Sequence, residues 1–213
     1  MGRGGGRVVL RCPHMKLGIV SDVHCNADGL RLAIEHMGDI DELLCAGDIV
    51  YQYRFGNEII EVLREHGARN VLGNHDITLL GRDGERARAA PFVRQDNLDY
   101  LTSQPISIEI DVGGGKKLVM THGSPVEPYD RYVYPGSKEL AELADYAADY
   151  LILGHTHYQM AERLGRCLVI NPGSAGEARD HRNGRLLTCC VLDTASGEVT
   201  FTDYEDPRFA AKP

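Results

Sequence analysis

The sequence of 213 residues lacks long apolar runs and lacks an excess of basic side chains. No stretch approaches the roughly 20 apolar residues that a membrane-spanning helix needs, which argues against a membrane protein. Thirty-one acidic residues against 23 Lys and Arg give a net charge of −8. Because non-specific nucleic-acid binding depends on basic side chains that neutralise phosphates, the sequence argues against that function as well.

The chain also lacks paired cysteine motifs, and we expect no secretory signal at its start. Its six cysteines contain no Cys-x-x-Cys pair, and the adjacent Cys189 and Cys190 make a poor disulfide framework. We therefore expect free, mostly buried thiols in a reducing cytoplasm. Residues 1–14 hold three arginines but no apolar signal segment, so we predict a flexible tail there and cytoplasmic localisation. The length predicts a single domain over residues 15–213.

Short apolar strands alternate with amphipathic helices in the first third of the chain. We predict strands over residues 16–20, 42–46 and 70–72, and helices over 27–37 and 56–66. Asn26 is a suitable N-cap for the first helix, and Gly67 is a stop signal for the second. This order is typical of parallel βαβ units, which bind ligands beyond the carboxyl ends of their strands.

The remaining two thirds of the sequence give a less regular pattern. Residues 77–104 are predicted to form a helical excursion near the site, and their arginines are either a phosphate clamp or a solvated face. A hairpin is expected over 106–112 and 117–120, a helix over 137–148 and a strand over 150–153. Further β-segments indicate a second, antiparallel sheet, near residues 158–163, 167–170, 185–192 and 198–204.

Five predicted strands end at polar tips, whose side chains are Asp22, His24, Asp48, Asn74, His122, His155 and His157. Two carboxylates, an amide oxygen and four imidazoles suit borderline divalent metals such as Mn, Fe, Co, Ni or Zn. One aspartate can bridge two cations about 3.5–4 Å apart. Two divalent cations with only two aspartates leave a net charge of about +2, which attracts a phosphate in spite of the acidic surface.

The motifs resemble those of the calcineurin-like metallophosphoesterase superfamily, in order across residues 16–176. They are Asp22-x-His24, Gly47-Asp48, Gly73-Asn74-His75-Asp76, Thr121-His122-Gly123 and Gly154-His155-x-His157. The tract at 47–50 and the short chain look like the small bacterial and archaeal phosphodiesterase branch. The resemblance implies an α/β fold, a four-layer α/β/β/α sandwich of two mixed β-sheets flanked by helices.

The resemblance also implies roles for the site residues. One metal would be held by Asp22, His24, Asp48 and His157, and a second by Asp48, Asn74, His122 and His155. Mn is the expected metal of both positions, with Fe, Zn, Co and Ni left open. His75 would face the substrate, stabilising the phosphoryl group or protonating the leaving oxygen, and Asp76 would orient His75. The segment Asn171-Pro172-Gly173-Ser174 matches a family segment of expected structural role.

The sequence departs from the family pattern in three ways. Cys25 stands where the family has glycine, and we interpret it as a tolerated small residue. Gln52 occupies the place of the phosphate-binding arginine of Ser/Thr protein phosphatases, which counts against that activity. Tyr51 and Tyr53 replace small residues, and with Tyr132 they are candidate substrate-binding residues. They could stack a nucleobase, although packing under loops is the alternative.

We therefore predict a dinuclear metal-dependent phosphodiesterase that acts on nucleotides or other small phosphodiesters through a metal-bridging hydroxide. Hydrolysis of dinucleoside polyphosphates or of phosphomonoesters stays open within the same chemistry. A non-catalytic scaffold is the alternative from another class, as in one retromer subunit that resembles the family in fold but lacks the catalytic histidine. His75 fills that position here. A homo-oligomer is left open, and no membrane partner is expected.

Overall fold

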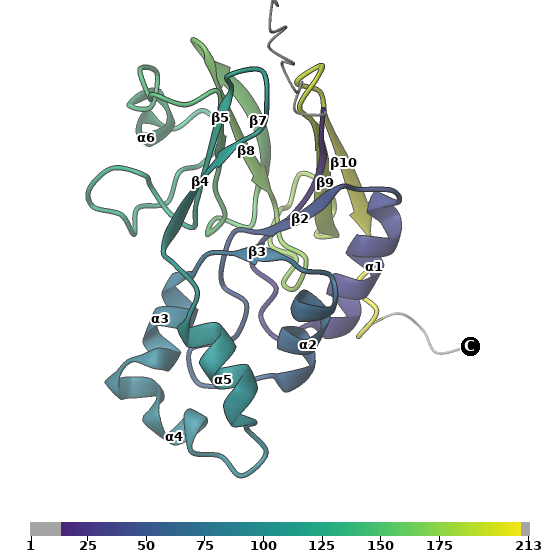
Figure 1. Ribbon diagram of the computed structural model, residues 1–213, viewed down its shortest axis with the longest axis vertical. Coiled ribbons are helices and arrows are strands. Elements are labelled where there is room, and N and C mark those ends of the chain that lie inside the picture. The colour runs from purple at the N-terminus through teal and green to yellow at the C-terminus, as the bar shows by residue number, and fades with distance from the viewer. Residues whose placement is uncertain (1–13, 210–213) are drawn as a thin grey trace, which may run out of the picture.

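The strand β1 (Lys16–Val20) lies at the centre of a five-stranded sheet because its side chains are apolar on both faces (Figure 1). The computed structural model describes residues 14–209. The first sheet has the order β10-β9-β1-β2-β3, in which β1, β2 and β3 run parallel and β9 pairs antiparallel with both β1 and β10. Its other strands are β2 (Glu42–Cys45), β3 (Arg69–Asn70), β9 (Leu187–Asp193) and β10 (Val199–Tyr204).

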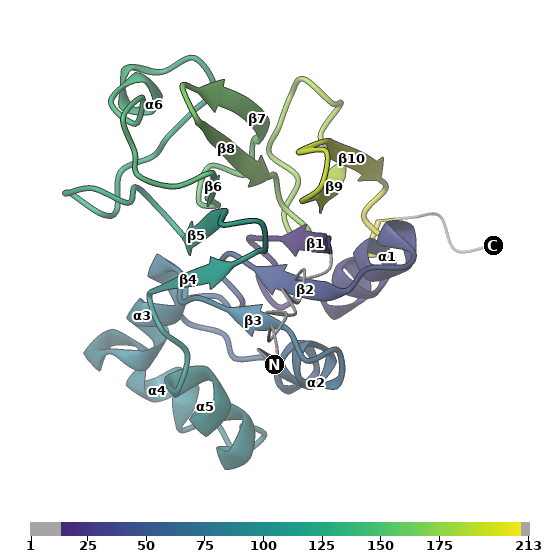
Figure 2. The ribbon, with the colours of Figure 1, turned by 45° about the horizontal axis from the view of Figure 1, so that its top comes forward.

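The second sheet has the order β4-β5-β6-β8-β7 and faces the first (Figure 2). Its three inner strands are parallel and its two edge strands antiparallel. The strands are β4 (Ser107–Asp111), β5 (Lys117–Thr121), β6 (Tyr150–Ile152), β7 (Gln159–Leu164) and β8 (Cys167–Pro172). Both sheets are therefore mixed, and each aligns the carboxyl ends of several parallel strands.

Strand alternation divides the apolar residues into layers. Leu17 and Ile19 of β1 pack against the second sheet, where Leu118 and Met120 of β5 meet them. Val119 points to the opposite face of the second sheet. This is the period of two that strands impose on their side chains. The contact between the sheets is thus a continuous apolar layer between the two sets of parallel strands.

Helices cover the outer face of the first sheet. The main ones are α1 (Ala27–Met37) and α2 (Asn57–Glu65). The Asn26 side chain accepts a hydrogen bond from the Gly29 N–H at 3.0 Å and so caps α1, as the sequence predicts. The layer continues past β3 with α3 (Asn74–Leu80), a 3₁₀ turn (Arg82–Gly84), α4 (Glu85–Arg88) and α5 (Gln95–Thr102). The other sheet carries only α6 (Lys138–Ala141) and loops.

The predicted fold class is confirmed: two mixed sheets flanked by helices form an α/β fold. The helical excursion over residues 77–104 is also present. Its Arg94 bonds to Asp96 and Glu61, and Arg88 donates to main-chain carbonyls, which favours a solvated face over a phosphate clamp. The five cysteines in the described range are free. The tail over 1–14 lies, apart from His14, outside the described residues.

Two expectations were wrong. The C-terminal β-segments do not form a separate antiparallel sheet, because β8 pairs in parallel with β6 while β9 pairs with β1. Local periodicity identifies such strands but not their partners. The helix expected over 137–148 ends at Ala141, since the N–H groups of Leu143, Ala144 and Tyr146 bond three residues back, as in tight turns.

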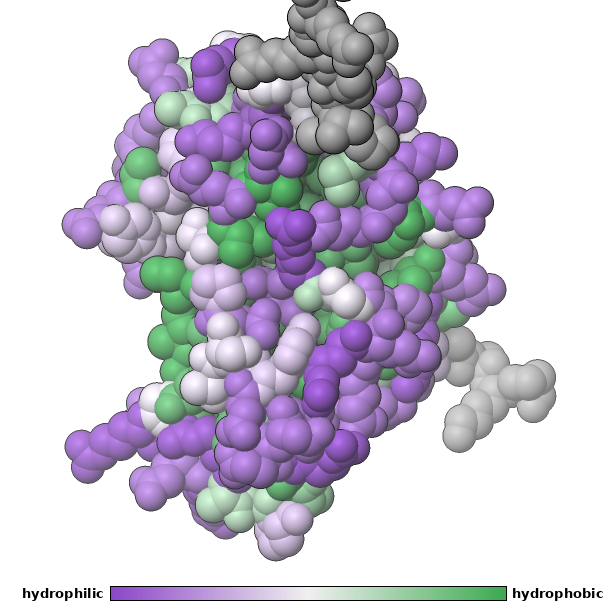
Figure 3. All heavy atoms as spheres, viewed as in Figure 1, coloured by the Kyte–Doolittle hydropathy of each residue, from purple (hydrophilic) through white to green (hydrophobic). Residues whose placement is uncertain are grey.

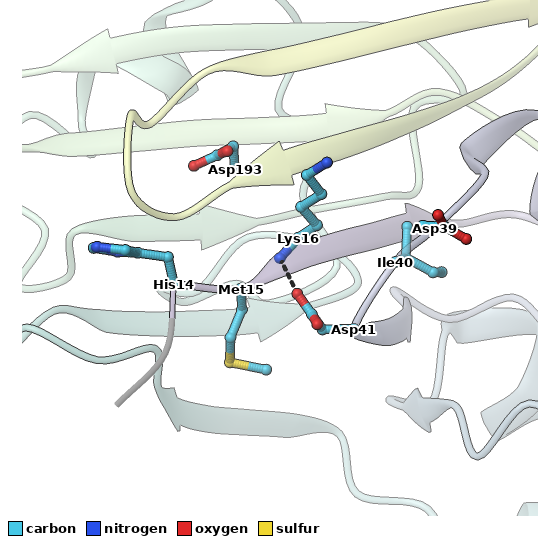
Figure 4. Close-up of a pocket in the computed structure, with 7 residues that line it drawn as sticks. All are labelled: His14, Met15, Lys16, Asp39, Ile40, Asp41 and Asp193. Atoms are coloured by element: carbon cyan, nitrogen blue, oxygen red, sulfur yellow. Dashed lines mark hydrogen bonds between the residues drawn. The ribbon is translucent and has the colours of Figure 1, made fainter. Parts of the chain in front are cut away.

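A small cavity lies at the amino end of β1, away from the strand ends that carry the polar tips (Figure 4). His14, Met15 and Asp193 line it, and the Lys16 N–H donates to Asp41 Oδ2 at 2.7 Å. Those side chains form no candidate metal cluster among residues 14–209. Within the same range, no helix is both long and apolar enough to cross a bilayer.

Leu44 tests the layer between the sheets, because its side chain is fully buried there. We predict that Leu44→Ala lowers the free energy of unfolding by about 2–5 kcal/mol, the range for deleting a buried leucine. Urea denaturation followed by circular dichroism measures it. Ile106→Ala is the control: that side chain is 65% exposed, so its effect should stay within about 0.5 kcal/mol. Equal losses in both variants would contradict the layer assignment.

Candidate dinuclear metal site

All seven polar tips predicted as metal ligands meet where the parallel strands of the two sheets end. Asp22, Asp48 and Asn74 follow β1, β2 and β3 of the first sheet. The histidines of the second sheet follow β5 and β6. Since parallel strands end at the same edge, packing the sheets face to face brings both sets of loops together.

The backbone at these tips is held in an unusual conformation. Positive φ angles between 47° and 69° occur at five of the seven predicted ligands, Asp22, His24, Asp48, His155 and His157. This left-handed region is uncommon for residues other than glycine and costs of order 1–3 kcal/mol each. Such strain is typical of functional sites, where the surrounding structure holds side chains in a required direction.

Asp48 lies in the middle of the cluster and is 2% exposed. Its Oδ2 is 3.3 Å from His122 Nε2 and 3.9 Å from His24 Nε2. The described residues hold three candidate ligand groups here: a first of Asp22, His24 and His157, a second of Asp48, His122 and His155, and a third of His24, Asp48 and His75. Asn74 Oδ1 lies 3.2 Å from His122 Nε2 and so completes the second group.

Main-chain carbonyls fix which ring nitrogen three of the four histidines turn to the cluster. His122 Nδ1 donates to the Ala46 carbonyl at 2.7 Å, and His157 Nδ1 donates to that of Glu177 at 2.8 Å. The Nε2 atoms of both rings are therefore available to bind a metal. His155 is reversed, because its Nε2 donates to a carbonyl at 3.0 Å and leaves Nδ1 for the cluster. This second layer of hydrogen bonds is typical of histidines that bind metals.

A buried acceptor without a donor marks the first ligand group. Asp22 Oδ2 accepts the His155 N–H at 2.9 Å, which ties the loop after β1 to the loop after β6. Its Oδ1 is buried and accepts no hydrogen bond of good geometry, although His157 Nε2 lies 3.2 Å away. A carboxylate oxygen and an imidazole nitrogen that face one another in a buried site fit a shared cation. The donors present thus suit divalent metal.

The electrostatics of the cluster follow from burial and close charges. Burial lowers the pKa of His24 to about 4, which keeps that ring neutral. Burial alone would lower the pKa of His122 too, but Asp48 and Asp22 outweigh it and raise that pKa to about 9. Burial disfavours the charged forms of both aspartates, yet the histidines lower the pKa of each. Metal must therefore displace a proton at His122 but none at His24.

A family model described as the calcineurin-like phosphoesterase superfamily domain matches residues 15–197. The chain belongs to this superfamily. It is 30% identical over 186 residues to a phosphodiesterase from Methanocaldococcus jannaschii, covering 86% of this chain and 96% of the relative. A metallophosphoesterase from Sphaerobacter thermophilus has a crystal structure that is 27% identical, with a TM-score of 0.72 over 92% of this chain and 90% of that one.

A more distant relative is a symmetrical bis(5′-nucleosyl)-tetraphosphatase from Shewanella. It is 26% identical over 170 residues, which cover 70% of this chain and 59% of that relative. The family and these relatives support phosphoester hydrolysis as the reaction class. The resemblance inferred from the motifs is thereby confirmed.

Asp76 occupies a different place from the one that the resemblance to the superfamily implies. Its carboxylate accepts the N–H groups of Ile49 at 3.2 Å, Val50 at 2.9 Å and Gly73 at 2.9 Å. Within the described residues it makes no hydrogen bond to the ring of His75. Asp76 therefore joins the loop of Asp48 to the turn before α3, and we propose that it positions Asp48; the role toward His75 stays a prediction.

The three predicted substrate-binding tyrosines differ in their surroundings: two stack on histidines of the cluster, and one is exposed. Tyr51 stacks on the His24 ring with centroids 4.5 Å apart, and Tyr132 stacks on His155 at 3.7 Å. Both rings thus cover a candidate metal ligand. Tyr53 is 61% exposed and stacks on no ring in the described structure. Cys25 points to the Arg54 carbonyl and belongs to no ligand group, in keeping with a tolerated small residue.

Sequence reasoning missed Glu177 at the rim of the site. Its Oε2 lies 3.8 Å from His24 Nε2 and 2.7 Å from Arg179, so a third carboxylate faces the first ligand group. Ser174 places it by accepting the Glu177 N–H at 2.7 Å and donating to the Asp22 carbonyl at 2.8 Å. The segment 171–174 was the available signal, since it matches the family just upstream.

The variant Asp76→Asn tests whether Asp76 positions Asp48 or orients His75. The asparagine side chain has only one acceptor oxygen, so its NH₂ group would face a main-chain N–H that the carboxylate now binds. The Asp48 loop would lose that hydrogen bond and become less well held. We predict Mn²⁺ affinity about 10- to 100-fold weaker, the usual effect of losing a group that orients a ligand. Calorimetry measures it, with the exposed Asp96→Asn as control. Unchanged affinity with slower turnover would instead assign Asp76 to His75.

Proton release tests the charge state of His122. Because its pKa is raised to about 9, His122 carries a proton at pH 7 until metal binds, and the proton must then leave. We predict that the heat of Mn²⁺ binding at pH 7 depends on the ionisation enthalpy of the buffer and that the dependence weakens as the pH rises through about 9. The surface variant His66→Ala should show the same dependence. Identical heats in all buffers at pH 7 would contradict the assignment.

Proposed function

We propose that this protein is a dinuclear metal-dependent phosphodiesterase acting on nucleotides or other small phosphodiesters. The observation that carries the proposal is the cluster of seven donors around Asp48, six of them buried and Asn74 half-buried, with His75 at its rim. Asp22, His24, Asp48 and His157 would hold one metal, and Asp48, Asn74, His122 and His155 the other. Bound divalent metals supply Lewis-acid polarisation of phosphoryl oxygens and an activated water.

His75 is arranged to donate a hydrogen bond to the substrate. Its Nδ1 accepts the N–H of Gln52 at 3.4 Å, so the ring proton resides on Nε2. That nitrogen lies 3.9 Å from Asp48 Oδ2, and the side chain is 20% exposed. A donor at the open rim of a buried cluster is suited to stabilise charge on a phosphoryl oxygen or to protonate the leaving oxygen. The main-chain N–H of His75 donates a hydrogen bond to Asp48 Oδ1 at 2.8 Å, which holds the backbone of His75 next to the cluster.

Arginines and tyrosines beside the first ligand group support the nucleotide part of the proposal. Tyr134, Tyr158, Arg179 and Arg185 line a cavity of about 350 Å³ next to Thr156. Aromatic faces and guanidinium groups together suit a base and its phosphates. The same cavity and the tetraphosphatase relative favour dinucleoside polyphosphate hydrolysis as a second candidate.

A scaffold function has less support. A scaffold needs neither strained ligand positions nor a donor poised at the rim, and this chain has both. Metal analysis after reconstitution with Mn²⁺ separates the two functions, because a scaffold predicts less than one equivalent per chain. The cytoplasmic setting and a homo-oligomeric state stay predictions.

Hydrolysis of bis(p-nitrophenyl) phosphate tests the proposed activity. Protein stripped with chelator should be inactive and should recover with Mn²⁺. We predict that His75→Ala lowers kcat at least about 100-fold while Mn²⁺ still binds, because the variant loses a hydrogen-bond donor and no metal ligand. Asp48→Asn should lose metal and activity together.

The surface variant His66→Ala is the control for His75→Ala and should keep full turnover. A His75→Ala enzyme that retains wild-type kcat would refute the assigned role of His75. Metal-loaded wild-type protein without any turnover on this diester would direct the proposal to dinucleoside polyphosphates.

A further inference from the structure

An apolar cavity opens directly onto the second ligand group. It has a volume of about 480 Å³, and Asn74, His122 and His155 form part of its wall. The rest of the wall comes from α3, from the segment that enters β4 and from the loop after β5. A group attached to a phosphate held at the cluster therefore has this cavity beside it.

Exposed hydrophobic side chains line its mouth. Ile77 is 50% exposed, Ile106 65% and Tyr129 61%, and Leu72 and Pro125 extend the apolar wall inward. Figure 3 shows hydrophobic residues gathered at the left edge of the molecule, between α3 and the start of β4. Large exposed apolar residues cost free energy in water, so their convergence on one cavity marks a binding surface.

Among residues 14–209, no lysine or arginine lines the cavity. Its one carboxylate is that of the exposed Asp130, which would repel an anion. A second phosphate is therefore disfavoured here. The cavity next to Thr156 differs, because Arg179 and Arg185 line it.

We propose that this cavity, which we call the apolar pocket, binds an uncharged apolar substituent of the phosphoester, an aromatic or aliphatic ring. The inference rests on the proposed function and adds a substrate class to it: esters with a ring next to the phosphate bound at the cluster. Esters with a ring are favoured over esters with a small alkyl group because the ring is buried against Leu72, Ile77 and Tyr129. A small alkyl group leaves the same apolar surface exposed to water.

Two phosphonates that differ only in the apolar group test the pocket. Phenylphosphonate and methylphosphonate both present a non-hydrolysable anion to the metal-loaded protein. We expect phenylphosphonate to bind at least about tenfold more tightly, the scale of burying a ring. Binding is measured by calorimetry and by inhibition of bis(p-nitrophenyl) phosphate hydrolysis. Ile77→Asn and Ile106→Asn should each reduce the ratio of the two affinities toward one, mainly by weakening the binding of phenylphosphonate.

Phe92→Asn is the matched control, since Phe92 is 59% exposed but does not line the pocket. It should keep the full preference for phenylphosphonate. Equal affinities of the two phosphonates in the wild type, or an unchanged preference in both isoleucine variants, would overturn the pocket assignment while hydrolysis stands. A metal-loaded protein that neither hydrolyses the diester nor binds either phosphonate would overturn the proposed function and the pocket with it.

Discussion

Asp48 carries a buried carboxylate with the Nε2 atoms of three histidines between 3.3 and 3.9 Å from it. The loop that holds it needs close backbone approaches: a Cβ at Gly73 would fall on Asp48, and one at Gly47 would meet the ring of His122. Asp76 bonds the two turns together through main-chain amides. The buried charges around Asp48 and the close backbone contacts of its loop need a rigid support, which the strand ends provide.

Face-to-face packing of two mixed sheets supplies that rigidity and also makes the site asymmetric. The loops of the first sheet contribute both aspartates, and those of the second contribute three histidines. Tyr51 and Tyr132 stack on ligand rings at opposite ends of the cluster. In the part of the chain that the structure describes, the apolar cavity has no lysine or arginine in its wall, whereas the cavity next to Thr156 is lined by Arg179 and Arg185. A substrate with one apolar and one polar arm would have a defined orientation in this site.

The sequence predicted the fold class and the membership of the cluster because both follow from local patterns. Each ligand stands just after a short apolar strand, and parallel strands align their ends. The partners of β8 and β9 depend on long-range pairing, which periodicity does not encode. The amide contacts of Asp76, the ring orientation of His155 and the approach of Glu177 all depend on main-chain groups distant in sequence. No spacing of residue types reveals them.

Electron paramagnetic resonance of Mn²⁺-loaded protein, combined with metal analysis, tests whether the site holds two metals that share the Asp48 carboxylate. We predict about two Mn²⁺ per chain with an exchange-coupled spectrum, because in the proposed site the carboxylate of Asp48 would belong to both metal positions. A single equivalent with the hyperfine pattern of isolated Mn²⁺ would contradict a dinuclear centre. Two equivalents without coupling would contradict the bridging position of Asp48.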